Sequence, residues 1–163
     1  MYNNLFINKS TNTNKEEKIL KSINLLKERI KEIDGGIVDT KSEIQSMNES
    51  ISKLKSIYVR RELKKYKITE EDLLNSKELR KILLNPDMDN INELSKHFEI
   101  KDDYNISDEK SDNEVIKACN YTINKSNEAI DKLKDLLKTY EQCKIFYTNE
   151  LNKFENELKK GLN

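Results

Sequence analysis

The fold of this chain is decided by residues 19–58, which read ILKSINLLKERIKEIDGGIVDTKSEIQSMNESISKLKSIY. Residues spaced alternately four and three apart in this stretch are apolar, with Thr40 as the exception. They are Ile19, Ile23, Leu26, Ile30, Ile33, Ile37, Thr40, Ile44, Met47, Ile51, Leu54 and Tyr58. Such an alternation, with Ile at the a positions and mostly Leu, Ile or Met at the d positions, is the seam of a coiled coil. The stretch therefore predicts one long helix whose seam is covered by a partner.

The limits of this first helix are predicted at residues 14–66. Thr13 and Glu16 have the spacing of a capping box, which marks a helix start. The seam keeps its phase through Gly35 and Gly36, so we expect the helix to pass through both glycines. Residues 1–13 are predicted to form an extended segment.

A second seam lies near the carboxyl end of the chain and predicts a helix over residues 111–162. Its positions are Ile116, Cys119, Ile123, Ser126, Ile130, Leu133, Leu137, Tyr140, Lys144, Tyr147, Leu151, Phe154 and Leu158. Ser111 and Glu114 give a capping box at its start. The neighbouring g positions are apolar as well, at Val115, Ala129, Leu136 and Cys143, and a stripe of that width indicates a third neighbour.

The middle segment, residues 67–110, is predicted to hold short helices and an acidic loop. Thr69 can cap a short turn, Ser76 can cap a helix over 77–84, and a further helix is expected over 87–98. The polar run over 101–113 is expected to be a mobile loop. The whole chain is predicted to be all-α: one domain, a long antiparallel helical hairpin with the short middle helices packed at or near its tip.

Antiparallel pairing of the seams is possible when paired residue numbers sum to 170, 177 or 184. If paired residue numbers sum to 184, Tyr140 faces Ile44 and Thr40 faces Lys144, so the two polar residues share one layer. If they sum to 177, Lys144 faces Ile33 and Thr40 faces Leu137, which buries polar groups against aliphatic ones. We therefore predict the register of 184. The main rival is a parallel homodimer through the first seam, because Ile at a with Leu at d favours two strands.

The composition argues against an enzyme. Of the 163 residues, 37% are charged and 35% hydrophobic, and the chain has one histidine, three glycines and two cysteines. One histidine cannot build a multi-histidine metal centre, and the glycines form neither a phosphate-binding loop nor a dinucleotide turn. His97 and Cys143 are interpreted as structural or surface residues, and Cys119 as a buried thiol in the seam. We expect no catalytic residue, metal, cofactor or small-molecule substrate.

The location of the protein is predicted from its hydropathy. No run approaches the roughly 18 apolar residues of a membrane span, and no signal peptide is recognised at the amino terminus. A cytoplasmic protein without a membrane contact is expected.

Charge is distributed unevenly although the basic and acidic residues balance at 30 each. Residues 53–67 hold seven basic side chains against one Glu, and residues 99–114 hold seven acidic side chains against two Lys. The candidate electrostatic patch consists of Arg60, Arg61, Lys64, Lys65 and Lys67. In an antiparallel hairpin these two stretches meet, so we expect them mainly to neutralise each other within the chain.

Candidate partner contacts are apolar side chains without an evident place in a seam: Tyr2, Leu5, Phe6, Ile7 and Phe146. Exposed apolar groups on a long helix commonly mark contact with another chain. The sequence thus favours a non-enzymatic coiled-coil adaptor or structural subunit that binds another protein or a copy of itself. The alternative is a small nucleic-acid- or nucleoprotein-binding regulator or inhibitor that uses the basic 53–67 helix end or the acidic 99–114 loop.

Overall fold

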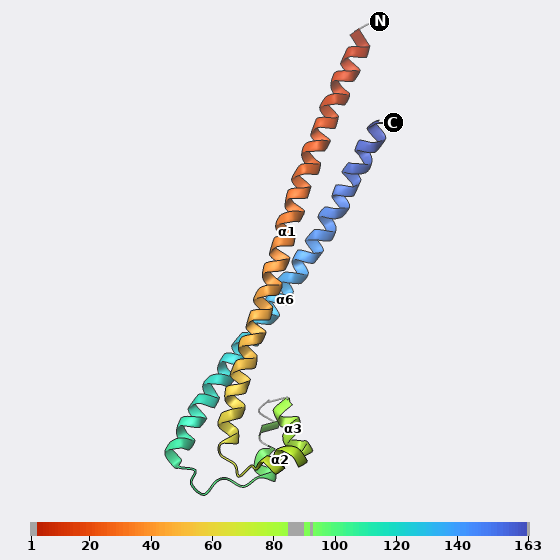
Figure 1. Ribbon diagram of the computed structural model, residues 1–163. Helices are drawn as coiled ribbons and strands as arrows, with labels where there is room; N and C mark the ends of the chain where they lie inside the picture. The colour runs from red at the N-terminus through yellow and green to blue at the C-terminus, as the bar shows by residue number, and fades with distance from the viewer. Residues whose placement is uncertain (1–2, 85–89, 92, 163) are drawn as a thin grey trace. The chain divides into compact units, whose positions relative to one another are not determined.

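The computed structural model describes residues 3–84, 90–91 and 93–162, with the backbone alone for 3–12, 106 and 162. Two long helices dominate it, α1 (Asn3–Leu63) and α6 (Ile106–Leu162). They run in opposite directions and pack against each other as a helical hairpin (Figure 1), which confirms the predicted all-α fold. Within this one chain, α6 lies against the seam of α1, as the hairpin predicts.

The chain divides into two compact units, each built from parts of both long helices. Unit 1 comprises Met1–Ile44 and Lys132–Asn163, and unit 2 comprises Gln45–Asp131. Unit 1 is a plain pair of helices. Unit 2 adds the short middle helices α2 (Glu70–Asn75), α3 (Lys77–Leu84) and α5 (Leu94–His97).

The described start of α1 corrects one prediction. Residues 3–13 are helical and not extended, so Thr13 lies inside α1 and does not cap it. The physical reason is that no Gly or Pro occurs between Asn3 and Asp34 to end the helix. As predicted, α1 continues through Gly35 and Gly36, neither of which has a positive φ, and it ends at Leu63, three residues earlier than expected.

The register of the two helices in unit 1 is also different from the predicted one. A Cβ atom on Gly36 would lie 2.8 Å from Cζ of Tyr140, so this ring sits directly against Gly36. The register of 184 instead puts Tyr140 opposite Ile44, about 12 Å further along the helix. Lys144 Nζ lies 2.6 Å from Oδ1 of Asp34. Both contacts fit a sum of about 177, so the prediction that Tyr140 faces Ile44 is wrong, although the Lys27–Glu155 pair expected with the register of 184 is present at 3.8 Å.

The polar seam residues of unit 1 avoid the cost of burying unpaired polar groups, which is expected for the register of 177. The Lys144 side chain is half-exposed and carries its ammonium group out of the seam to Asp34. The buried Thr40 donates its hydroxyl proton to the carbonyl oxygen of Gly36, at 2.7 Å. Gly36 lacks a side chain and leaves room for Tyr140. Each polar group therefore has a partner, and no polar layer is needed.

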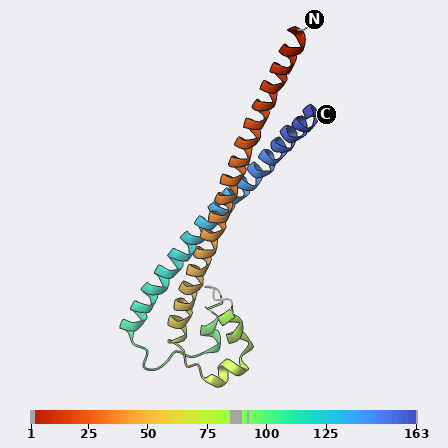
Figure 2. The same ribbon diagram turned by 45° about the horizontal axis from the view of Figure 1, so that its top comes forward.

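The core of unit 2 combines side chains from the end of α1, the start of α6 and the middle segment. Figure 2 shows the short middle helices beside the end of α1. Leu79 on α3, Leu94 on α5 and the nearby Ile91 are its most deeply buried side chains. The buried members are Tyr58, Val59, Tyr66, Leu79, Ile82, Ile91, Leu94 and Ile116. The middle helices therefore pack at the tip, as predicted, and cover apolar positions of both long helices.

Side-chain caps set the limits of the short helices. Thr69 and Asp72 form a complete capping box at α2, and the Ser76 hydroxyl accepts a hydrogen bond from the Leu79 N–H at α3, which confirms both predicted starts. The helix expected over 87–98 is only partly confirmed. Residues 85–89 and 92 lie outside the described part, 90–91 are helical, Glu93 is in a turn and α5 spans Leu94–His97.

The start of α6 lies five residues before the predicted one. The side-chain oxygen of Asn105 accepts a hydrogen bond from the Ser107 N–H, at 3.2 Å, and the Asn105 carbonyl oxygen accepts one from Glu109. Asn105 thus caps α6, and Ser111, the predicted cap, lies inside the helix. Residues 106–113, expected in a mobile loop, form its first two turns.

Candidate functional site

An apolar groove opens between α1 and α6 in unit 1. Its volume is about 290 Å³, and it is lined by Ser22, Leu25, Leu26, Phe146, Tyr147, Glu150 and Phe154. Leu25 is 57% exposed and Phe146 is 60% exposed. The Phe146 ring lies edge-on to Tyr147 at 5.5 Å between ring centroids, which holds it at the mouth of the groove. The groove thus offers aliphatic and aromatic surface to solvent.

Helix periodicity places this surface beside the seam. Leu26, Tyr147 and Phe154 are seam residues and form the floor, while Leu25 and Phe146 lie outside the seam and form the rim. The other side of the helix pair is closed by ion pairs that join the two helices, Lys27 to Glu155 at 3.8 Å and Lys144 to Asp34 at 2.6 Å. One side of unit 1 therefore exposes an apolar groove, and on the other side ion pairs connect the two helices.

A second hollow of about 350 Å³ lies further along the same side. Its lining includes Lys15, Ile19, Glu157 and Leu158. Lys15 precedes the groove residue Ser22 by seven positions, and Glu157 follows Glu150 by seven, so they share heptad positions. The open side therefore continues from an apolar centre into a charged end.

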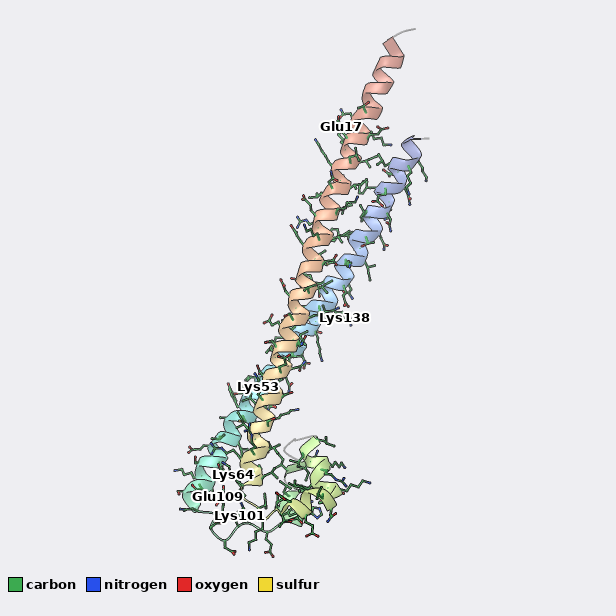
Figure 3. The ribbon with its side chains drawn as sticks, in the orientation of Figure 1. Glu17, Lys53, Lys64, Lys101, Glu109 and Lys138 are labelled. Carbon is green, nitrogen blue, oxygen red and sulfur yellow. The ribbon has the colours of Figure 1, made fainter. Side chains whose placement is uncertain are left out.

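The candidate electrostatic patch lies at the carboxyl end of α1, in unit 2. Figure 3 shows Lys64 in the turn after α1, Lys101 in the loop and Glu109 on α6 at this end of the unit. The structure brings opposite charges together here, as the sequence predicted.

Arg61 makes the strongest of these contacts. Its guanidinium group donates to Oδ1 of Asp112 at 2.8 Å, and the Tyr104 hydroxyl donates to Oδ2 of the same carboxylate at 2.8 Å. The Asp112 side chain is 7% exposed. The hydrogen bond from Arg61 lowers the pKa of Asp112, while burial and then the bond to Asp112 raise the pKa of Tyr104. Asp112 is thus held as a carboxylate that ties α1 to α6.

Lys65 and Lys67 are paired within the chain as well. Lys65 Nζ lies 3.3 Å from Glu62 and donates to Asn113 at 3.0 Å. Lys67 lies 3.2 Å from Asp102 and 3.8 Å from Glu99. Neutralisation between the two stretches is therefore confirmed for Arg61 and Lys67, whereas Lys65 pairs with Glu62 of its own stretch.

The two other cations of the patch have different surroundings. Arg60 donates its Nε proton to the Ser56 carbonyl oxygen, at 3.3 Å. Lys64 lines a surface pocket of about 380 Å³ whose lining includes Lys101, Asp103 and Asp108. This pocket mixes both signs of charge, so it does not present the uniformly positive surface that phosphate groups favour.

The amino-terminal contacts stay predictions. Tyr2 lies outside the described residues, as do the side chains of Leu5, Phe6 and Ile7, whose backbone belongs to α1. Phe146, the other predicted contact, is at the groove. Sequence reasoning missed Leu25, although its place at a polar position of the heptad was a usable signal.

Residues with catalytic or metal-binding chemistry are dispersed. Cys119 is buried and Cys143 half-buried, both as free thiols, and His97 is exposed. Within the described ranges, no three His, Cys, Asp or Glu side chains are grouped so that they could hold a metal ion. Among the described helices, none has the length and apolar character needed to cross a membrane.

Comparisons of this chain with protein-family models, with curated proteins and with solved structures give no match. The functional argument consequently rests on the geometry of the two units alone.

Proposed function

We propose that the protein is a non-enzymatic, cytoplasmic coiled-coil adaptor or structural subunit that binds protein through the apolar groove of unit 1. The observation that carries this proposal is the exposure of Leu25 and Phe146 at the rim of one groove. Burying such side chains contributes roughly 1.5 to 3 kcal/mol each, and aromatic anchors are typical of binding hot spots. The amino-terminal residues Tyr2, Leu5, Phe6 and Ile7 are a second proposed contact.

The alternative, a nucleic-acid-binding regulator, has less support. Three cations of its candidate patch, Arg61, Lys65 and Lys67, already pair with acidic side chains of the same chain. Binding phosphate groups would require these pairs to break, and the acidic residues would then repel the ligand. The intrachain pairs therefore favour the adaptor.

The test is affinity purification of the tagged full-length protein from its native source, followed by quantitative mass spectrometry. Leu25→Glu and Phe146→Glu place a charge at the groove rim, and we expect each to lower partner recovery by about tenfold or more, the effect of losing one hot-spot residue. Val38→Glu is the matched control, because Val38 is comparably exposed in unit 1 and does not line the groove.

The salt dependence of partner recovery distinguishes protein binding from nucleic-acid binding. Recovery through an apolar groove should change little between about 50 and 200 mM salt, whereas nucleic-acid binding through many phosphate contacts falls by decades. Equal recovery with Phe146→Glu, Leu25→Glu and the wild-type chain would remove the groove from the proposal. Recovery of nucleic acid with a steep salt dependence would favour the alternative.

A further inference from the structure

The charges beside the groove follow a simple order along α1. The side of α1 that carries Ser22 and Leu25 continues at helical spacing in both directions, and we call this set the groove face. Its members are Lys15, Lys18, Ser22, Leu25, Arg29, Glu32, Gly36, Asp39 and Glu43. Along the chain, all of its cations come before all of its anions. The sign changes once, between Arg29 and Glu32.

The most exposed aromatic rim residue lies at the level of this sign change. In unit 1, Asp34 contacts Lys144 and Gly36 contacts Tyr140, so residues at one level have numbers that sum to about 177. Phe146 is therefore level with residue 31 of α1. The groove face thus has an apolar group at its centre, a basic half on one side and an acidic half on the other.

We propose that the partner seated on the groove face is a second copy of this chain, bound antiparallel about a two-fold axis that passes near Phe146. Such an axis sets Phe146 against Phe146 of the second copy. It also brings the basic half of each α1 against the acidic half of the other, with Lys18 opposite Glu43. Arg29 and Glu32, which pair within α1 at 3.7 Å, lie near the axis. Self-complementarity of this kind is what a two-fold interface requires.

The parallel arrangement of two copies is disfavoured by the same charges. It would keep the basic halves of both α1 helices at one end of the dimer and the acidic halves at the other, and like charges at the same level oppose association. The charge order therefore selects one direction for the second copy.

The size of the face is adequate for a stable contact. Residues 15–43 span about 42 Å of helix, and α6 lies beside them, so two helices each about 10 Å wide offer on the order of 800 Å² per copy. A standard protein interface buries about 800 Å² on each partner. This inference rests on the proposed function, since both need the groove to bind protein, but it names the occupant.

The experiment measures the mass of the full-length protein by sedimentation velocity over about 1 to 100 µM, which brackets the weak end of interfaces of this size. We expect a monomer–dimer equilibrium for the wild-type chain. Phe146→Glu should leave a monomer throughout. Circular dichroism on each variant checks that the helices are intact, so that a lost dimer is not mistaken for unfolding.

A charge exchange tests the direction. Lys18→Glu and Glu43→Lys each set like charges together at two symmetric sites, and we expect each to weaken the dimer by about tenfold. The double variant Lys18→Glu/Glu43→Lys restores opposite charges in an antiparallel dimer and should recover the wild-type dissociation constant. Lys31→Glu is the control, because Lys31 is exposed and is not a member of the groove face, and it should change nothing.

Three results would overturn the inference: a wild-type monomer at every concentration, a dimer that tolerates Phe146→Glu, or a double charge exchange that fails to recover binding. A monomer that still captures a different protein through Phe146 would end self-association and leave the proposed function standing. A wild-type chain that neither associates with itself nor captures another protein would overturn both the proposed dimer and the proposed function.

Discussion

Replacing Gly36 with Ala tests the register of unit 1 against a neighbour that serves as its own control. In both Gly35→Ala and Gly36→Ala, alanine gains about 1 kcal/mol over glycine inside a helix. At Gly35 nothing lies within 4 Å of the added Cβ, so the full gain should be realised. We expect Gly35→Ala to raise the melting temperature by about 2 to 4 °C, the shift that 1 kcal/mol gives in a chain of this length.

At Gly36 the same gain meets a steric cost. The added Cβ would lie 2.8 Å from Cζ and 3.0 Å from Cε1 of Tyr140, so the ring must move. Forcing an extra carbon into a packed site costs about 1 to 3 kcal/mol. Gly36→Ala should therefore be neutral or destabilising, and the two alanine variants should differ by about 1 to 3 kcal/mol.

The assay is urea unfolding followed by circular dichroism at 222 nm, with a double variant to identify the cause. In Gly36→Ala/Tyr140→Leu the smaller side chain leaves space for the new methyl group, so the cost of Gly36→Ala should be smaller in the Tyr140→Leu background than in the wild-type chain. If Gly35→Ala and Gly36→Ala stabilise the protein equally, Tyr140 does not lie against Gly36. The register of 177 would then be refuted, since the register of 184 puts Tyr140 opposite Ile44.

Three further predictions concern unit 2. Asp112→Asn should lower the free energy of unfolding at pH 7 by about 1.5 to 3 kcal/mol, the value of a hydrogen bond to a charged group. Because folding lowers the pKa of Asp112, its contribution to stability is present above the ordinary Asp pKa of about 3.9 and is lost as the pH falls through the folded value. In urea titrations between about pH 5 and 2, the variant should therefore lack this part of the acid sensitivity. Leu79→Ala, at a side chain with 0% exposure, should cost about 2 to 5 kcal/mol, whereas Leu84→Ala, at 86% exposure, should stay within about 0.5 kcal/mol; equal effects would contradict the assigned core. Thr69→Ala removes the capping box of α2 and should cost about 1 kcal/mol in the same unfolding assay, and an unchanged stability would mean that α2 does not depend on its cap.

The sequence predicts the long helices and their seams because a period of 3.5 residues sustained over many heptads has one structural solution. It predicts the starts of α2 and α3 for a similar reason, since Thr69 and Ser76 are side chains that satisfy particular backbone N–H groups. It fails at the start of α6. The run around Asp108 and Asp112 is as polar as a loop, but Asn105 caps it and Asp112 pairs with Arg61, fifty-one residues away in the chain.

Of the candidate site, the sequence predicts Phe146 but not Leu25 or the groove. Phe146 stands out because an aromatic residue at a solvent-facing heptad position has no internal reason to be there. The groove itself depends on which residue of α1 lies beside Phe146, and that is a matter of register. That Leu25 and Phe146 line one groove follows only from the register of 177, which the sequence does not predict.

The register error has a physical origin that applies to coiled coils in general. Pairing seam positions layer by layer treats each side chain as if its polar group stayed in its own layer. The ammonium group of Lys144 is carried on a four-carbon stem and leaves the seam for Asp34, while the hydroxyl of Thr40 finds its acceptor one turn back on its own helix. Neither residue therefore leaves an unpaired polar group buried in its layer. What distinguishes the registers is volume: Tyr140 needs space, and along this part of α1 Gly36 provides it. A glycine facing a large aromatic residue is thus a stronger constraint on helix pairing here than two polar residues that could share a layer.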